Sequence, residues 1–313
     1  MNNELKIKVV DHAQKWAKDN KLSQAELAKR TSINPSYLSN MLRNNFIVEV
    51  DGKDVSIADK WFYQLADCTG FAVKKSYWAT VLTSEFEMII HELTVAKKES
   101  KVTTIINDTG LGKTYAVDKF VMVNAQHTYC ITVNSMHKLR DIINELANLL
   151  GTPIRHNSLD TFFSIIKRLR ELKMMGHQPL VIIDEAENLK LPVIQMLKGL
   201  YDGVINYASV VMIGTSQLTD ALQKLSHSNK NGAPQFFRRI KAGIRVIPAH
   251  KDFKPFFQKF KIDDKGLRDL LTRLCNNYGE LHDYLEPALR EADEAGQPLT
   301  EQFFRVMYNL PKQ

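Results

Sequence analysis

The segment Asn107-Asp-Thr-Gly-Leu-Gly-Lys-Thr114 decides the fold, because it stands between an apolar run and a helical stretch. The apolar run Val102–Ile106 is typical of a strand, and Tyr115–Met122 is typical of a helix. Backbone N–H groups of such a glycine-containing loop, together with the positive end of the helix behind it, bind phosphate groups. The segment therefore predicts a nucleotide site at a strand–loop–helix junction.

Two side chains at the helix start have distinct expected roles. Lys113 is expected to reach the outer phosphates, and Thr114 is expected to hold Mg²⁺. Asn107 stands where the usual phosphate loop has its first glycine, and asparagine tolerates left-handed backbone better than most residues do. The remaining residues expected to contact the nucleotide are Asn107, Asp108, Thr109, Gly110, Leu111, Gly112 and Tyr115.

A second signal is the unbroken apolar run that begins at Leu180 and ends in two carboxylates, Asp184 and Glu185. Such a run indicates a strand buried on both faces, and open α/β sheets bind ligands at the carboxyl ends of their strands. Asp184 is suited to hold Mg²⁺, and Glu185 is suited to polarise the attacking water. The alternative, a solvated acidic pair at a strand end, is disfavoured by the phosphate loop upstream.

Two weaker elements follow in the order that this chemistry needs. Thr215 comes directly after the apolar run Val210–Gly214, where its hydroxyl could bond the water or the γ-phosphate; a plain strand-end threonine is the alternative. Arg238 and Arg239 precede the last predicted strand, where a guanidinium could reach a neighbouring subunit's nucleotide as an arginine finger. A surface or DNA-facing basic pair is the alternative there.

Size and composition are those of an ordinary globular protein with room for two or three domains. The chain has 313 residues, of which 44% are hydrophobic and 25% charged. Its net charge of +7 favours an anionic partner, nucleic acid above all, although a merely basic surface is the alternative. Three scattered cysteines predict neither a disulfide framework nor a metal cluster and fit a reducing cytoplasm. No apolar run approaches membrane length, so we expect a cytoplasmic protein.

Residues 1–70 form the first predicted domain. Ser23 and Glu26 form a capping box at the start of a short helix, and Pro35 begins a second one, so the pair predicts a helix-turn-helix. The residues expected to face DNA are Ser36, Tyr37, Asn40 and Arg43. A small helical bundle without DNA contact is the alternative. The domain is completed by a predicted helix at Leu5–Asn20, a hairpin at Phe46–Ile57 and a helix at Ala58–Cys68.

The rest of the chain divides into a linker, a core and a lid. Residues 71–100 are the linker, with a helix expected over 74–98, and residues 101–250 alternate strand and helix as parallel α/β sheets do. Residues 251–313 predict a lid of three or four helices. Strands are predicted at 102–106, 128–133, 179–184, 208–213 and 243–247, and helices at 113–122, 136–150, 159–174 and 191–201.

The order of phosphate loop, acidic strand end, Thr215, Arg239 and helical lid resembles the AAA+ ATPases. With the N-terminal helix-turn-helix, the whole chain resembles the B-type transposition regulators of phage Mu and the related target selectors and insertion-sequence helper ATPases. The resemblance implies ATP and Mg²⁺ as cofactors and homo-oligomers that bind double-stranded DNA with little sequence preference. It also implies a cognate transposase as partner.

Carried over by position, the resemblance gives further roles. Glu185, Thr215 and Arg239 would be catalytic, and Thr114 and Asp184 would bind metal. The DNA-contacting residues of the core would be Lys138 and Arg140, which follow the second strand, with Lys167 and Arg168 as the second choice.

Three departures from the family pattern bear on function. Asn107 replaces a glycine, Thr109 stands where proline is common, and His282 stands where the lid usually has an arginine. Slow hydrolysis, with ATP acting mainly as an assembly switch, would follow. A replicative helicase loader and an ATP-gated helix-turn-helix transcription regulator stay open as alternatives, and competition by unrelated DNA separates the regulator from a target selector.

Overall fold

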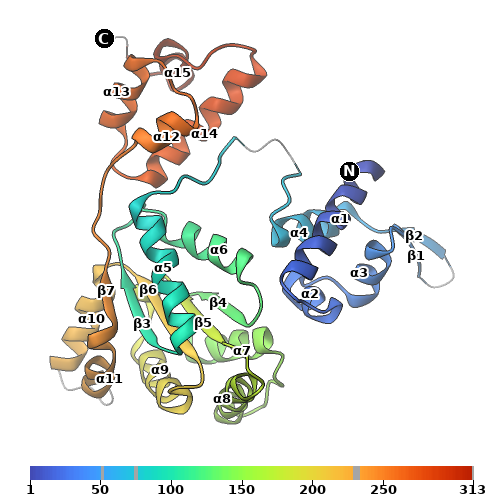
Figure 1. Cartoon of the computed structure of the whole chain (residues 1–313), viewed down its shortest axis with the longest axis vertical. Coiled ribbons are helices and arrows are strands. Elements are labelled where there is room, and N and C mark those ends of the chain that lie inside the picture. Colours follow the sequence, from blue (N-terminus) through green and yellow to red (C-terminus); the bar gives the residue numbers. More distant parts are fainter. Residues whose placement is uncertain (51–52, 74–76, 228–232, 312–313) are drawn as a thin grey trace.

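The computed structural model describes residues 1–50, 53–73, 77–227 and 233–311. An N-terminal helical module, a central α/β core and a C-terminal helical bundle follow one another along the chain (Figure 1). The turn at residues 51–52 of the predicted hairpin and residues 74–76 of the predicted linker helix lie outside the described residues. None of the described helices is long and apolar enough to cross a membrane.

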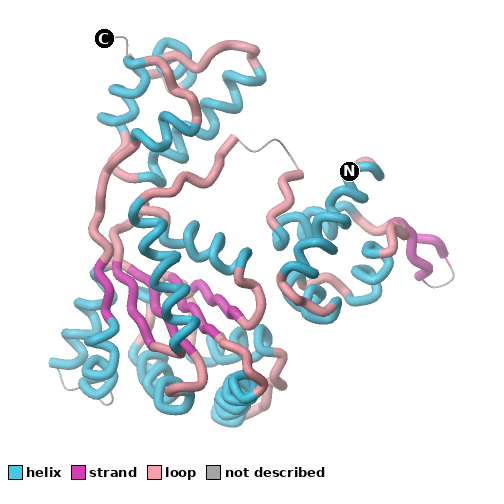
Figure 2. The backbone as a smooth tube through the Cα atoms, in the orientation of Figure 1, coloured by secondary structure: helices cyan, strands magenta, loops and turns pink. Residues whose placement is uncertain are grey.

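The core is built on one sheet of five strands in the order β4-β5-β6-β3-β7, and every neighbouring pair in it is parallel. The strands appear in magenta in Figure 2, side by side with the helices around them. The α/β fold class with a parallel sheet is therefore confirmed. The strand bounds are β3 Val102–Ile106, β4 Thr128–Thr132, β5 Leu180–Asp184, β6 Ser209–Gly214 and β7 Ile244–Val246.

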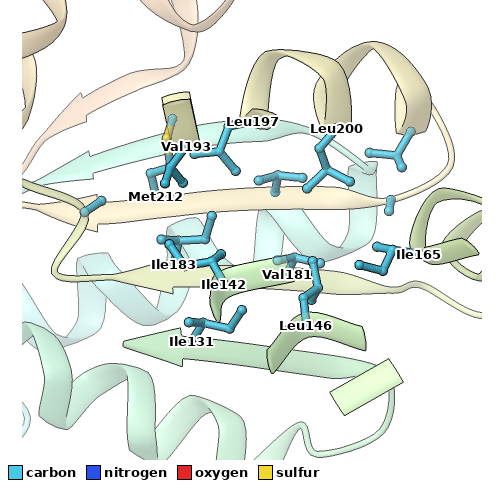
Figure 3. Packing of buried hydrophobic residues seen from close by; sticks show 14 of the residues in the cluster. Ile131, Ile142, Leu146, Ile165, Val181, Ile183, Val193, Leu197, Leu200 and Met212 are labelled. Atoms are coloured by element: carbon cyan, nitrogen blue, oxygen red, sulfur yellow. The ribbon is translucent and has the colours of Figure 1, made fainter. Parts of the chain in front are cut away.

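Helices cover both faces of this sheet, because the central strands are apolar on both sides. Along β5, Leu180 and Ile182 pack against the cluster of α5 (Ser84–Glu99) and α6 (Lys113–Val123). Val181 and Ile183 point the other way, toward α7 (Leu139–Leu150), α8 (Ser158–Met174) and α9 (Leu191–Val204) (Figure 3). A strand without alternation in sequence thus lies in the middle of three layers.

Some predicted helix bounds were wrong. The linker helix was expected over 74–98, but α5 begins at Ser84, where the Thr83 hydroxyl accepts the N–H of Phe86. Residues 77–83 are not helical, since Trp78 and Val81 pack on the C-terminal bundle instead. The helix expected from 136 begins at Leu139. Two helices of the core were missed altogether, α10 (Ser216–His227) and α11 (Ala233–Ile240).

The C-terminal bundle confirms the predicted helical lid and sits over the carboxyl edge of the sheet (Figure 1). Its attachment depends on Glu85, which is fully buried and accepts the N–H of His250 at 2.6 Å and the hydroxyl of Tyr278 at 3.2 Å. The linker helix, the hinge after β7 and the bundle therefore meet at one buried carboxylate. The bundle helices are α12 Lys254–Lys259, α13 Lys265–Leu274, α14 Tyr278–Glu294 and α15 Glu301–Met307.

The N-terminal module contains the two predicted short helices, α2 (Gln24–Thr31) and α3 (Pro35–Leu42). The capping box between Ser23 and Glu26 is present, as predicted. The helices pack with α1 and α4 around Leu27, Leu38 and other buried side chains. The remaining elements are α1 Asn3–Asp19, β1 Ile47–Val50, β2 Lys53–Ser56 and α4 Asp59–Thr69, with β1 and β2 antiparallel.

The module is attached to the core around the loop from α6 to β4. The indole N–H of Trp16 donates to the carbonyl of Met122 at 3.1 Å, and the Asn20 side chain accepts the N–H of Ala125 at 3.3 Å. Gly70 has φ +73°, which residues with a side chain rarely adopt, and a Cβ atom there would stand 2.5 Å from the sulfur of Met122 and displace that side chain. These contacts connect the module to the far end of the helix that begins at the phosphate loop.

His127 lies in the same loop and predicts a pH dependence of stability. Burial, followed by the charge of His177 whose ring stands 4.1 Å away, lowers the pKa of His127 to about 4. Because folding favours the neutral ring, stability is retained above the ordinary pKa of 6.5 and is lost as the pH falls toward 4. The backbone of His127 has φ +54°, which asparagine tolerates, so His127→Asn removes the titration with little strain.

We expect wild type to lose about 1 kcal/mol more stability than His127→Asn between pH 7 and 4.5, a value discounted for the half-exposed position. Denaturant midpoints of both proteins at the two pH values measure this difference. Equal losses in the two proteins would show that His127 is not responsible.

Candidate nucleotide site

The phosphate loop connects β3 to α6 and uses left-handed backbone at two glycines. Gly110 has φ +76° and Gly112 has φ +81°, conformations that residues with a side chain rarely adopt. A Cβ at Gly110 would stand 2.3 Å from the Asn277 side chain, and the N–H of Gly279 donates to the carbonyl of Gly110 at 2.9 Å. The loop is therefore held directly by the first turn of α14 in the lid.

Asn107 does not take the left-handed backbone that its position suggested. It is buried, its N–H donates to the carbonyl of Gly214, and its side-chain amide donates to the carbonyl of Ile247 at 3.1 Å. The asparagine thus ties the loop to the strands on either side of β3. Its Oδ1 is buried and accepts no hydrogen bond from the described residues.

Lys113 is directed back over its own loop. Its ammonium donates to the carbonyls of Asn107 at 3.0 Å and Asp108 at 2.8 Å. Burial lowers the pKa of Lys113, and nearby carboxylates, Glu187 foremost, oppose that effect. A partly buried ammonium with only carbonyl partners and acidic neighbours fits a site that takes a polyanion such as a triphosphate.

The two predicted metal ligands are in contact. The Thr114 hydroxyl donates to Asp184 Oδ2 at 2.8 Å, and Asp184 Oδ1 accepts the N–H of Glu185 at 2.9 Å. Asp184 is only 1% exposed. No cluster of three or more His, Cys, Asp or Glu suited to a metal occurs in the described parts of the chain. One carboxylate and one hydroxyl fit Mg²⁺, which usually keeps several waters and takes phosphate oxygens for its other ligands.

The turn after β5 orients the second carboxylate of the pair. Glu185 has φ +52° and an exposed side chain, and it leads into the short 3₁₀ helix η1 (Ala186–Asn188). The Asn188 amide donates to the carbonyl of Val133 at 3.1 Å and contacts Glu185 Oε2 at 3.4 Å. The carboxylate expected to act on water is thus attached to the end of β4.

A cavity of about 570 Å³ opens between the core and the lid. Its polar side contains the loop from Thr109 to Tyr115, together with Glu185 and Thr215. The Thr215 hydroxyl is buried and has no hydrogen-bond partner within the described residues. The opposite side is apolar and aromatic and is formed by Trp78, Val81, Phe86, Phe256 and Tyr278. The cavity therefore combines an end suited to phosphate groups with a surface suited to a purine base.

The two candidate finger arginines are placed differently. Arg239 lies on the flank of α11, where its guanidinium binds the Asp202 carboxylate at 2.9 Å and lies 5.6 Å from the ring centre of Tyr201. Arg238 is exposed. Neither lines the chain's own cavity, so the structure does not bring Arg239 to the other catalytic candidates.

The candidate DNA residues do not form one surface. Lys138 and Arg140 are exposed at the start of α7, whereas Arg168 lines a smaller cavity with Leu149 and Leu150 at the other end of that helix. Lys167 and Arg168 both lie within 4.0 Å of Glu171.

In the N-terminal module, Ser36 and Arg43 are exposed, as expected. Tyr37 is half-buried against Trp61, and Asn40 donates to the Ser36 carbonyl and accepts from Asn45. Tyr37 and Asn40 are thus less available to contact DNA than the sequence predicted.

Sequence reasoning missed Glu187 and the aromatic side of the cavity. Glu187 stands two residues after Glu185, and this proximity was the available signal. Trp78 was assigned to the linker helix, and Phe256 and Tyr278 lie in the segment that was predicted only as a helical lid, since nothing in their spacing distinguishes a base-binding aromatic residue from a core residue. Only the tertiary arrangement brings the three together.

The comparisons with known proteins agree with this geometry. Residues 96–222 match the family described as AAA domain. The chain carries an AAA+ ATPase domain. It is 26% identical over 183 residues to the Mu-like prophage FluMu DNA transposition protein B of Haemophilus influenzae, a match that covers 58% of this chain and 60% of that protein. The resemblance to the Mu B-type regulators is thereby confirmed.

Solved structures show the same fold at low sequence identity. The ORC2 protein of Aeropyrum pernix, in ADPNP–ADP complexes, aligns with a TM-score of 0.52 and 18% identity over 74% of this AAA+ chain and 69% of its own. Cdc6p of Pyrobaculum aerophilum aligns with a TM-score of 0.52 and 16% identity over 70% and 68% of the two chains.

Proposed function

We propose that this protein is an ATP-dependent DNA-binding ATPase that oligomerises on target DNA with little sequence preference and recruits and stimulates a transposase. The observation that carries the nucleotide part is the cavity that Lys113, Thr114 and Glu185 line under the lid, with Asp184 hydrogen-bonded to Thr114 behind its wall. The transposition part rests on the similarity to the prophage protein B, whose printed name is that of a DNA transposition protein.

The residues of the cavity have different roles in ATP hydrolysis in this proposal. Lys113 would bind the outer phosphates of ATP, and Thr114 and Asp184 would hold Mg²⁺, which would supply positive charge to the phosphate oxygens. Glu185 orients the attacking water, and the buried hydroxyl of Thr215 donates to the water or to the γ-phosphate. Each of these roles needs positioning and charge more than covalent chemistry.

Hydrolysis is slow and stimulated by DNA in this proposal, and ATP acts mainly as an assembly switch. His282 lines the cavity where related lids have an arginine, but its Nδ1 lies 3.1 Å from the Asp283 carboxylate and its ring packs on Trp78. A histidine held in this way supplies less positive charge to a γ-phosphate than a guanidinium would. A single-turnover rate as fast as that of a motor ATPase would contradict this point.

Oligomerisation supplies the groups that the single chain does not bring together. An arginine of α11 would complete the neighbouring protomer's site, which requires either Arg238 or a release of Arg239 from Asp202. The duplex would be contacted by Lys138 and Arg140 in the core. The exposed Ser36 and Arg43 of the helix-turn-helix would contact a duplex or the partner protein.

Competition by unrelated DNA tests the proposal against an ATP-gated transcription regulator. With ATP present, we expect long unrelated duplexes to displace a labelled duplex with midpoints within about tenfold of one another, because phosphate contacts carry no sequence information. A preference of about 10³ or more for one sequence would instead identify a regulator. Fluorescence anisotropy at fixed salt measures both outcomes, since affinity for phosphates depends steeply on salt.

A further inference from the structure

Glu187 is a carboxylate of the nucleotide cavity to which none of the roles above is assigned. It lies in η1, directly after β5, and lines the same cavity as Lys113 and Thr215. Its Oε2 accepts the backbone N–H of Thr215 at 3.4 Å. The carboxyl ends of β5 and β6 are therefore joined by this side chain, at the point where the catalytic candidates meet.

Gly214 makes the approach of Glu187 possible. A Cβ atom at position 214 would stand 2.5 Å from Glu187 Oε2 and 3.3 Å from the backbone nitrogen of Glu187. Carbon and oxygen atoms do not approach to 2.5 Å without a shift of one of them. A side chain at position 214 would therefore displace the Glu187 carboxylate, so the glycine and the carboxylate form one arrangement.

The arrangement contacts the backbone that carries the hydroxyl of Thr215. That hydroxyl is buried, lies in the cavity wall and has no hydrogen-bond partner among the described residues. A buried hydroxyl without a partner carries a desolvation cost unless a ligand satisfies it. We propose that Glu187 is a positioning residue for ATP hydrolysis, which holds the backbone of Thr215 so that the threonine hydroxyl is directed at the reacting phosphate. This inference rests on the proposed ATPase function.

Electrostatics support the same placement. Among the carboxylates that oppose the lowering of the Lys113 pKa by burial, Glu187 has the largest effect, ahead of Asp184, Asp108 and Glu185. Its carboxylate also accepts the N–H of Thr215, directly before α10, and negative charge is favourable at a helix N-terminus. A purely structural cap would stabilise the helix without affecting the chemical step, so the two roles make different predictions.

The test compares Glu187→Ala, Glu187→Gln and Thr215→Val in the full chain. We expect Glu187→Ala to lower kcat by about tenfold or more with ATP affinity within about threefold, because misplacement of one group near the reacting atoms costs rate more than binding. Glu187→Gln keeps an oxygen acceptor and is expected to retain kcat within about threefold. The double variant Glu187→Ala/Thr215→Val is expected to be no slower than Thr215→Val alone, because Glu187 acts through Thr215.

Hydrogen exchange in the nucleotide-free protein supplies a readout that does not depend on hydrolysis. The amide of Thr215 is expected to exchange about fivefold faster in Glu187→Ala than in wild type, since it loses its acceptor. Gly214→Ala displaces the carboxylate without removing it, and we expect the same faster exchange and the same loss of kcat. This variant keeps the test decisive if Glu187→Ala does not fold.

Unchanged exchange and kcat in Glu187→Ala, or additive losses in the double variant, would overturn the inference. A wild-type protein that binds no ATP would instead overturn the proposed function, so the two failures are distinguishable.

Discussion

Replacement of Glu185 by glutamine is expected to lower kcat for ATP hydrolysis by about 10²–10³-fold, with ATP affinity within about threefold of wild type. Glu185 follows the buried Asp184 on a left-handed backbone, and its exposed carboxylate lies in the wall of the cavity. The amide has the same shape but is a much weaker base, so the water would lose its orienting charge. Steady-state phosphate release and a fluorescent-nucleotide titration measure the two quantities.

Glu187→Gln is the matched control for this experiment. It makes the same chemical change two residues away on the same turn, and its kcat is expected to stay within about threefold of wild type. A Glu185→Gln protein that hydrolyses ATP at the wild-type rate would remove Glu185 from the mechanism. ATP binding lost together with hydrolysis would show that the side chain serves binding instead.

Charge reversal at Lys138 and Arg140 is expected to weaken ATP-dependent DNA binding by about 10²-fold at 0.1 M salt and to reduce the slope of log affinity against log salt by about two. Both side chains are exposed at the start of α7, after the carboxyl end of β4. They would contact phosphates, whose contribution to affinity is electrostatic and independent of sequence. Anisotropy titrations over a range of salt concentrations measure the affinity and the slope.

The double variant Lys167→Glu/Arg168→Glu provides the comparison. Its net charge changes equally, but both residues already lie near Glu171 and Arg168 lines the cavity against the N-terminal module, so a smaller loss of DNA affinity is expected. Thermal melting of both double variants checks that folding is intact. Full DNA affinity after reversal of Lys138 and Arg140 would contradict the assignment of the core surface.

The central sheet was predictable from the sequence because the segments with strand-like apolar patterns are also the segments that are buried in the folded core. The central strands β5 and β6 consist mainly of apolar residues and end in Asp184 and Gly214, and all five strands begin and end within one residue of their expected bounds. The phosphate loop and the acidic strand end were predictable for a related reason. Each of these two motifs consists of residues that are next to one another in sequence. The parallel sheet then brings Lys113 and Thr114 of the first motif close to Asp184 of the second.

What could not be predicted depends on contacts between distant segments. Residues 77–83 contain Trp78 and Val81 at helix-like spacing, but these side chains are partly buried against the lid and the segment is not helical. The role of Asn107 depends on Ile247, which lies 140 positions away. The ion pair between Arg239 and Asp202 joins α11 to α9, and no local sequence pattern in either helix predicts this contact. The proposed domain boundaries and the roles of the individual site residues stay predictions.

The central claim is that ATP assembles this chain around double-stranded DNA, and electron microscopy tests it most directly. The purified protein would be imaged with a long duplex, Mg²⁺ and a non-hydrolysable ATP analogue, beside the same mixture without nucleotide and beside Lys113→Ala. We expect rings or filaments that encircle the duplex only when wild-type protein and the analogue are both present. Isolated monomers or dimers under all three conditions would contradict the account.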